Sequence, residues 1–367
     1  MSWTNIEFKD FVILQRGFDL PVSKMKDGDV PVLGSNCIVG YHNEAKVEPP
    51  GVVTGRSGTL GLVQYTESPF WPHNTALWVK DFRGNYPKFV YYKLQTLQLE
   101  RFNGGASVPT LNRNVLDTLN LRIPIYGVQE KIATLLSAYD DLIENNNRRI
   151  QLLEESARLL YQEWFVRLRF PGYEHSRIVE GVPEGWKKKT LEELADVKMG
   201  QSPESKFYNS NGEGLPFHQG VSDFGERFVI SSVYSTALNR ISEAGDILCS
   251  VRAPVGRLNI TIDKIVIGRG VAALRSKTGH QSFLYYQLKN HFFKEDMIGG
   301  GAIFASVTKK DLLAQAMLTP KDSLIRSFED TSVNTDIQIQ NLFLQNQKLK
   351  TARDLLLPRL ISGEIVV

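Results

Sequence analysis

The chain repeats one long pattern, and this repeat limits its possible folds more than any other feature of the 367 residues. The letters YYKL at 91–94 return as YYQL at 285–288, 194 residues later. GGA at 104–106 returns at 300–302, and Pro124 returns as Pro320, both 196 residues later. Upstream the match is looser, with residues 52–56 resembling 247–252 as an apolar strand that ends near an arginine. Self-similarity over most of a chain indicates a tandem duplication, so we expect two similar domains.

A helical pattern follows each of these two prolines. Residues at spacings of three and four form a mostly apolar stripe, as in the seam of a coiled coil, first over 143–164 and again 196 residues later. The first set is Ile143, Asn146, Ile150, Leu153, Ala157, Leu160 and Trp164, and the second is Ile339, Leu342, Asn346, Leu349, Arg353, Leu356 and Leu360. The first helix is predicted over roughly residues 128–167, which makes it about 60 Å long at 1.5 Å per residue.

One apolar stripe on each helix can be buried in two ways. A helical hairpin could pack on a single ordinary core, whereas the duplication favours a pair in which each stripe covers the other. Such a pair is antiparallel if the copies are related by a pseudo-two-fold axis. Asn146 and Asn346 would set its register or would lie at an open end, and Arg353 interrupts the second stripe.

These patterns predict an α+β fold in which a tandem duplication produces two similar mixed α/β domains. The domains are expected at residues 1–124 and 183–320. Two long antiparallel coiled-coil helices are expected to separate them, within helical spacers at residues 125–182 and 321–367.

Composition excludes several classes of protein. The length and a hydrophobic content of 42% allow two cored domains, and no apolar run of membrane-spanning length or secretory signal is expected, which favours the cytoplasm. Cys37 and Cys249 have no C-x-x-C spacing and are expected to be buried thiols. A net charge of +3 does not by itself indicate a nucleic-acid-binding protein.

The helical segments resemble a known family, the specificity subunits of type I restriction-modification enzymes. QEKIA at 129–133, LSAYDDLIENN at 136–146 and LYQEWFV at 160–166 are similar to the family's central conserved region, and LLPRLISGEI at 356–365 is similar to its distal one. GW at 185–186, followed by Leu191, Ala195, Gly200 and Pro203, resembles the opening of a second target recognition domain. The second copy departs from the pattern at 322–326, where DSLIR replaces the expected Gln-Glu helix start.

The resemblance implies a non-catalytic subunit that recognises double-stranded DNA. Its two domains differ in sequence, so the target would be bipartite and asymmetric. In the family, the helical regions seat two modification subunits, which methylate adenine at N6 with S-adenosylmethionine. Restriction subunits, which use ATP and Mg to translocate and cut DNA, join the same complex. No cofactor is therefore expected in this chain.

A search for catalytic motifs supports a binding protein. Residues 55–61 contain glycines but lack the lysine of a phosphate-binding loop, and EPPG at 48–51 lacks both ends of an adenine methyltransferase motif. The six histidines show no H-x-x-x-H spacing, so no metal is expected. Two alternatives stay open: an architectural coiled-coil adaptor for protein partners, and a divergent methyltransferase or nuclease.

Base readout needs arginine, lysine, amide or hydroxyl side chains on loops that reach a DNA groove. Position in the sequence suggests Arg56, Ser57, Thr59, Asn74 and Arg83 in the first domain. In the second domain the candidates are Arg252, Arg257, Arg269, Ser306, Thr308 and Lys309. The glycines at 104–105 and 299–301 would let backbone approach DNA, or would form turns that need positive φ.

Overall fold

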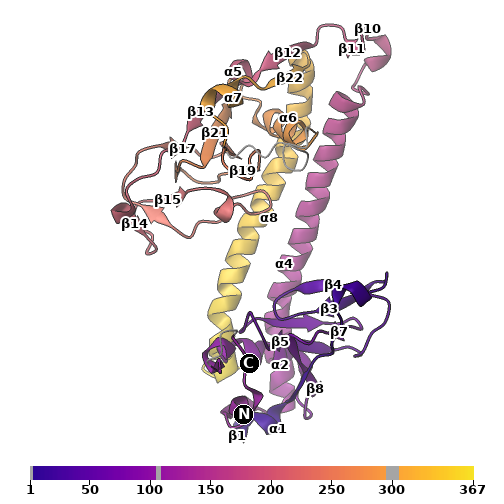
Figure 1. Ribbon diagram of the computed structural model, residues 1–367, viewed down its shortest axis with the longest axis vertical. Coiled ribbons are helices and arrows are strands. Elements are labelled where there is room, and N and C mark those ends of the chain that lie inside the picture. Colours follow the sequence, from indigo (N-terminus) through magenta and orange to yellow (C-terminus); the bar gives the residue numbers. More distant parts are fainter. Residues whose placement is uncertain (1–2, 105–108, 295–305) are drawn as a thin grey trace. The chain divides into compact units, whose positions relative to one another are not determined.

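The computed structural model describes residues 3–104, 109–294 and 306–367, which form two compact units. Unit 1 comprises Met1–Arg148 and Leu342–Val367, and unit 2 comprises Arg149–Asn341. Both boundaries fall inside the long helices α4 (Tyr126–Tyr161) and α8 (Asp322–Ser362), so each helix contributes to both units (Figure 1).

Unit 1 is built on a four-stranded antiparallel sheet. Its order is β2 (Ile13–Arg16), β8 (Ala76–Asp81), β5 (Gly51–Gly55) and β6 (Val63–Thr66). A smaller sheet contains β4 (Ile38–His42), β3 (Val30–Leu33) and β7 (Trp71–Pro72), and β1 (Trp3–Glu7) pairs with β9 (Asn120–Pro124). The helical segments are α1 (Phe8–Phe11), η1 (Val22–Lys24), α2 (Pro87–Gln95), η2 (Leu99–Phe102) and α3 (Arg113–Leu116).

Unit 2 repeats this plan. Its four-stranded antiparallel sheet has the order β13 (Ala195–Met199), β21 (Val271–Ser276), β18 (Ile247–Ser250) and β19 (Leu258–Ile260), and β12 (Lys187–Thr190) pairs with β22 (Ala316–Thr319). A larger second sheet contains β14 (Tyr208–Asn209), β16 (Tyr234–Ser235), β15 (Leu215–His218), β20 (Ile265–Ile267) and β17 (Ile241–Ser242). The remaining elements are η4 (Tyr173–His175), β10 (Ile178–Val179), β11 (Val182–Pro183), α5 (Leu191–Leu194), η5 (Ser205–Phe207), η6 (Val221–Asp223), α6 (Gln281–Lys294) and α7 (Lys309–Leu313).

The predicted duplication is confirmed by the pairing of the strands. Leu77 of β8 pairs with Thr54 on one side and Arg16 on the other. Ala272 of β21 pairs in the same way with Cys249 and Met199. Every element of the four-stranded sheet in unit 1 therefore has a counterpart at the same place in unit 2.

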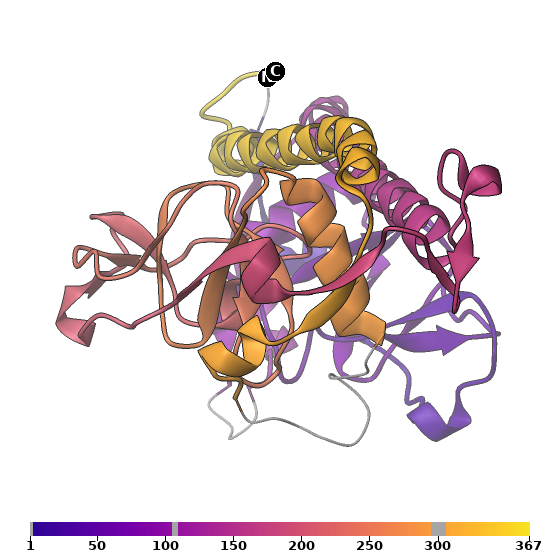
Figure 2. The ribbon, with the colours of Figure 1, turned by 90° about the horizontal axis from the view of Figure 1, so that it is seen from above.

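Aromatic and aliphatic side chains form a separate core in each unit. Phe8, Phe11 and Phe89 are fully buried in unit 1, and Phe165, Phe283 and Phe328 make mutual edge contacts in unit 2. In unit 2, α6 lies beside α8 (Figure 2), where Glu329 of α8 accepts hydrogen bonds from the backbone N–H groups at the start of α6. The half-buried carboxylate thereby satisfies donors that the helix itself leaves open.

The long helices pack on the domain cores as well as on each other, which combines the two arrangements that the sequence left open. Ile132, Leu136 and Leu360 belong to the core of unit 1, and Leu160 and Trp164 pack on the core of unit 2. Of the predicted seam, Ile143, Ile150, Ile339, Leu342 and Leu360 are buried, whereas Leu153, Leu160, Trp164, Leu349 and Leu356 are half-buried.

Within unit 1 the two helices run antiparallel and are joined by polar contacts. Asn146 Nδ2 donates to Asn346 Oδ1 at 2.9 Å, and Asn346 Nδ2 donates to Asn147 Oδ1 at 2.8 Å. The two asparagines are therefore buried partners. Arg353, which interrupts the apolar stripe, forms an ion pair with Asp140.

Two local expectations need correction. Regular α-helix in α4 ends at Tyr161, and a π-helical turn, Gln162–Val166, completes the predicted span. Cys249 is buried as expected, but Cys37 is exposed because it lies in the turn between β3 and β4. Across the described residues, no helix combines the length and apolar character that crossing a membrane requires.

Candidate nucleic-acid interface

Three arginines gather in unit 1 where the central sheet ends. Arg16 ends β2, Arg56 follows β5, and Arg113 begins α3. They line a hollow of about 520 Å³ together with Thr110, Asn112 and Asn114, among other residues. None of the described residues that line this hollow is acidic. The combination of guanidinium, amide and hydroxyl groups is the one that DNA-binding proteins direct at phosphates and base edges.

Backbone contacts build this surface. A Cβ atom at Gly55 would lie 2.0 Å from the carbonyl oxygen of Thr59, so only glycine allows the chain to turn back so closely. Arg56 N donates to Thr75 O at 2.8 Å, Leu111 N donates to Arg56 O at 2.9 Å, and the Arg56 side chain donates to Asn74 O at 3.1 Å. Arg56 is therefore held in place before any ligand arrives.

A polar chain extends from this cluster. The Asn74 amide donates to the carboxylate of Asp19, and this bond, together with the nearby Arg16, lowers the pKa of Asp19. Arg16 also pairs with Asp19 at 3.2 Å. Asp19 thus stays ionised and orients both an arginine and an amide.

The structure brings together most of the residues that the sequence suggested in the first domain. Ser57 and Asn74 lie beside Arg56, since Ser57 N donates to Thr75 O and Arg56 contacts Asn74 O, and Thr59 lies against Gly55. Arg83 does not join them. It follows Asp81, which pairs with Ile13 at the opposite end of the sheet.

In unit 2 the six suggested residues lie at one end of the central sheet, five of them on loops and Lys309 at the start of α7. Arg252 pairs with Ser306 in an isolated bridge, and Val307 N donates to Val251 O at 2.9 Å. Thr308 caps α7 by accepting from Asp311 N, which places Lys309 at the first position of that helix. Arg257 lies in the turn after β18, where its backbone N–H donates to Ser250 Oγ at 2.9 Å.

Arg269 is exposed in the turn that precedes β21. The Ser202 hydroxyl donates to Gln219 Oε1 at 2.6 Å and accepts from Arg269 N at 3.1 Å, while Gly270 N donates to Gln219 O. A Cβ atom at Gly268 would lie 2.6 Å from Gln219 Oε1, so the glycine permits this close approach. The backbone of Arg269 is thereby fixed beside a second hollow of about 670 Å³.

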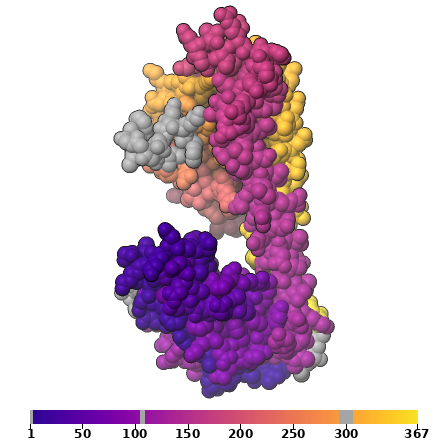
Figure 3. Space-filling model, turned by 90° about the vertical axis from the view of Figure 1, so that its right-hand side faces the viewer, coloured from indigo at the N-terminus to yellow at the C-terminus, as the bar shows by residue number. Residues whose placement is uncertain are grey.

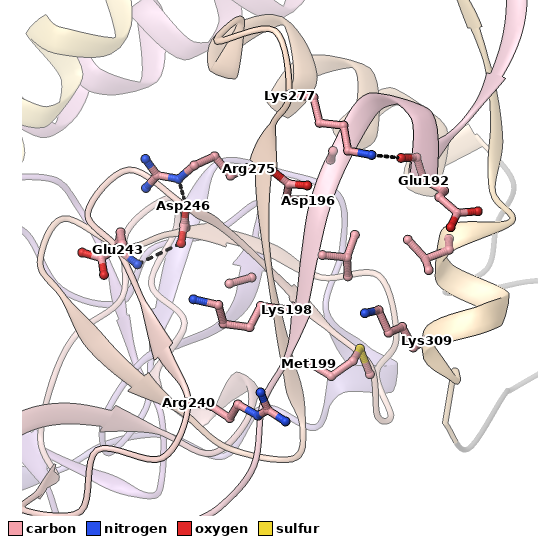
Figure 4. Close-up of a pocket in the computed structure, with 14 residues that line it drawn as sticks. Glu192, Asp196, Lys198, Met199, Arg240, Glu243, Asp246, Arg275, Lys277 and Lys309 are labelled. Carbon is pink, nitrogen blue, oxygen red and sulfur yellow. Dashed lines mark hydrogen bonds and ion pairs between the residues drawn. The ribbon is translucent and has the colours of Figure 1, made fainter.

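Lys309 lines another hollow of about 670 Å³ that mixes both signs of charge (Figure 4). Some of its side chains are held by partners: Lys198 donates to Ile241 O, Lys277 donates to Glu192 O, and Arg275 pairs with Asp246. Lys309 and Arg240 are exposed at its rim. The mixture does not favour a small anion bound inside the hollow, but it leaves cationic side chains at the surface.

Sequence reasoning missed Arg16, Thr110, Asn112 and Arg113. The repeat could have identified three of them, because Thr110, Asn112 and Arg113 lie 196 residues before the candidates Ser306, Thr308 and Lys309. Arg16 offered no such signal, since it reaches the site only through the pairing of β2 with β8. The candidate glycines at 105 and 299–301 lie outside the described residues.

Comparison with known proteins agrees with this architecture. The family model of the type I restriction modification DNA specificity domain matches residues 2–155 and 183–323. The provisionally named MjaX type I restriction enzyme specificity subunit of Methanocaldococcus jannaschii is 32% identical over 264 residues, which cover 70% of this chain and 62% of that protein. The MjaIX specificity subunit of the same organism is 25% identical over 88% of this chain and 79% of that protein.

The fold also has a solved counterpart. The S subunit of a type I restriction-modification system from M. genitalium superposes with a TM-score of 0.66 over 98% of this chain and 96% of that one, at 19% identity. The matched family is a DNA specificity domain and the relatives are named specificity subunits, which agrees with the prediction of a non-catalytic subunit. The chain therefore belongs to the family of type I restriction-modification DNA specificity proteins.

Proposed function

We propose that this chain selects the DNA target of a type I restriction-modification complex, with one half-site read by each unit. The observation that carries this proposal is the pair of matching sheet ends. Each unit places cations and polar side chains on the loops at the end of a four-stranded sheet of the same order, yet the side chains differ between the copies. Equal scaffolds with different side chains suit two different half-sites, and hence an asymmetric bipartite target.

The long helices would seat the partner subunits. Figure 3 shows the outer surface of α4 open to solvent in each unit. Leu142 in unit 1 is 51% exposed and Leu152 in unit 2 is 63% exposed, and Leu135 and Leu159 lie seven residues from them on the same helix. Exposed leucines at heptad spacing on a polar helix are typical of a face that another protein covers.

The chemistry would belong to those partners. Two modification subunits would bring S-adenosylmethionine for adenine methylation, and restriction subunits would use ATP and Mg, all in the cytoplasm. This chain would select the DNA sequence and provide the surface on which the partner subunits dock.

Substituting Leu142 or Leu152 with glutamate should then abolish co-purification with the modification subunit, while Lys24→Glu on the exposed η1 segment should not.

Methylation mapping tests the central claim. The chain would be co-expressed with the adenine methyltransferase encoded beside it, and methylated adenines would be read by sequencing in cells with and without this chain. We expect one bipartite, asymmetric motif that requires the chain. Methylation or cleavage by the purified chain with cofactor alone would contradict the proposal, and co-purification with neither methyltransferase nor DNA would favour the adaptor alternative.

A further inference from the structure

The two copies can be compared position by position, because the backbone places their loops in the same register. In unit 1, Leu111 N donates to Arg56 O at 2.9 Å, and in unit 2 the matching bond runs from Val307 N to Val251 O at 2.9 Å. The neighbouring bridges join Ser57 to Thr110 and Arg252 to Ser306. Arg56 therefore corresponds to Val251, and Ser57 corresponds to Arg252, although the sequence suggests a match between the two arginines.

This comparison separates positions that changed from positions that did not. Arg16 corresponds to Met199, since they pair with the equivalent residues Leu77 and Ala272. Arg56 and Val251 differ as well, and so do Ser57 and Arg252. At three of the compared positions around the sheet end, the two copies thus present different chemistry.

One cationic position is retained. Arg113 and Lys309 are both exposed, and each is the first residue of a short helix. The side chain before each one caps that helix, Asn112 by accepting from Asn114 N and Thr308 by accepting from Asp311 N. Three residues beyond each cation, a buried leucine, Leu116 or Leu312, anchors the segment in its core. Both cations are therefore displayed at the same place on rigid backbone.

Two half-sites of an asymmetric target differ in their bases and share the sugar-phosphate backbone. Side chains that differ between the two copies are therefore suited to contact the bases, which differ between the half-sites. A side chain whose positive charge is kept in both copies is suited to contact the phosphates, which both half-sites share. We infer that Arg113 and Lys309 are equivalent phosphate contacts, whereas Arg56 in the first copy and Arg252 in the second read bases. This inference rests on the proposed function and assigns roles within it.

Residue exchange in the full-length chain tests this assignment. Duplexes would first be selected from a random pool by the chain bound to its methyltransferase. Affinity for a selected and an unselected duplex would then be measured between 50 and about 200 mM salt. Arg113→Gln and Lys309→Gln should weaken binding to both duplexes by the same factor, leave the selected bases unchanged, and reduce the slope of log K against log salt by about 1.

Arg56→Gln and Arg252→Gln remove the same charge and serve as matched variants. Each should change the selected bases in a single half-site, a different one for each variant, and lower the preference for the selected duplex about tenfold. Arg83→Gln, at the other end of its sheet, should change neither quantity. Circular dichroism and the unfolding midpoint would show that every variant is folded.

The outcomes distinguish the inference from the function beneath it. If Arg113→Gln or Lys309→Gln altered the selected bases, or left the salt slope unchanged, the phosphate assignment would be wrong while the proposed function stood. The same holds for the base readers if Arg56→Gln and Arg252→Gln weakened all duplexes equally. If the wild-type complex selected no sequence at all, the proposed function itself would fail.

Discussion

Arg227 shows how one residue of the second domain is tied to both long helices within unit 2. Its side chain is 2% exposed and pairs with Asp336 of α8, and its Nη1 atom lies 3.6 Å from Oε1 of Glu154 in α4. Its guanidinium stacks over the Tyr285 ring at 4.6 Å, and its carbonyl accepts from Ile260 N in β19. A buried cation with two acidic neighbours is costly to remove, because the carboxylates then lose their counter-charge.

Arg227→Met should therefore destabilise unit 2 by about 3 kcal/mol. Chemical unfolding followed by circular dichroism measures the change. Arg240→Met, which removes an exposed arginine of the same unit, provides the control and should shift the midpoint little. Equal effects of the two substitutions would show that the buried network adds no stability.

His218 makes the stability of unit 2 depend on pH. Its side chain is fully buried, and burial lowers its pKa even though Asp223, 3.4 Å away, acts in the opposite sense. The unfolded chain then binds a proton more readily than the folded one. The free energy of unfolding of unit 2 is therefore highest above a pH of about 6.5. Below that pH it falls by at most about 1.4 kcal/mol per pH unit. Unfolding midpoints measured at several pH values should fall on acidification, and they should fall less steeply for His218→Gln than for the wild-type chain. If the two chains showed the same dependence on pH, the dependence would come from other titratable groups.

At the scale of elements, the asparagine pair couples α4 to α8 in unit 1. Asn146→Leu leaves Asn346 Oδ1 without its 2.9 Å donor in a buried place, which should cost about 1–3 kcal/mol. Asn346→Leu should cost a similar amount. The double substitution replaces both partners with apolar side chains and should recover most of that loss. A double-mutant cycle by chemical unfolding measures the coupling between the two asparagines. If the double variant lost the sum of the two single losses in free energy of unfolding, the asparagines would not be coupled.

The elements also show which inferences the sequence supports. The two long helices follow from the periodicity of the apolar residues, and the duplication follows from the repeated letters. Arg353 was expected only to interrupt a stripe, because its partner Asp140 lies 213 positions away in sequence. Arg227 gave no signal for the same reason. Strands β5 and β8 are offset from β18 and β21 by 195 residues, whereas the short helices α3 and α7 are offset by 196, so a one-residue shift hides which side chains correspond.

A repeated bond shows how each domain is joined to the helix that follows it. Tyr92 OH donates to Asp140 in unit 1, and Tyr286 OH donates to Asp336 at 3.0 Å in unit 2. The arginine that completes each group differs in origin. Arg353 comes from α8 in unit 1, and Arg227 comes from the recognition domain in unit 2. Both copies thus keep the tyrosine–aspartate hydrogen bond, but the arginine that neutralises the aspartate comes from a different segment in each. This is expected where the balance of charge matters more than the segment that provides it.

For the whole molecule, the proposed function makes the length of the two helices a property of the DNA target. A helix rises 1.5 Å per residue, so three added heptads lengthen it by about 31 Å, close to the 34–36 Å or so of one turn of DNA. Whole heptads also keep the apolar seam in register. Insertion of 21 residues into both α4, after Arg148, and α8, after Asn341, should preserve both half-sites and lengthen the gap by about nine or ten base pairs.

Shorter and unpaired insertions are the matched comparisons. One heptad in both helices adds about 10 Å, or roughly three base pairs, and so turns the second half-site about a third of the way around the DNA. That variant should bind the original half-sites more weakly at every gap length. Three heptads in α4 alone leave the seam of α8 without a partner and should reduce folding. The methylated motif of each variant, read by sequencing, decides the matter: an unchanged gap after paired insertion would mean that the helices do not set the distance between half-sites.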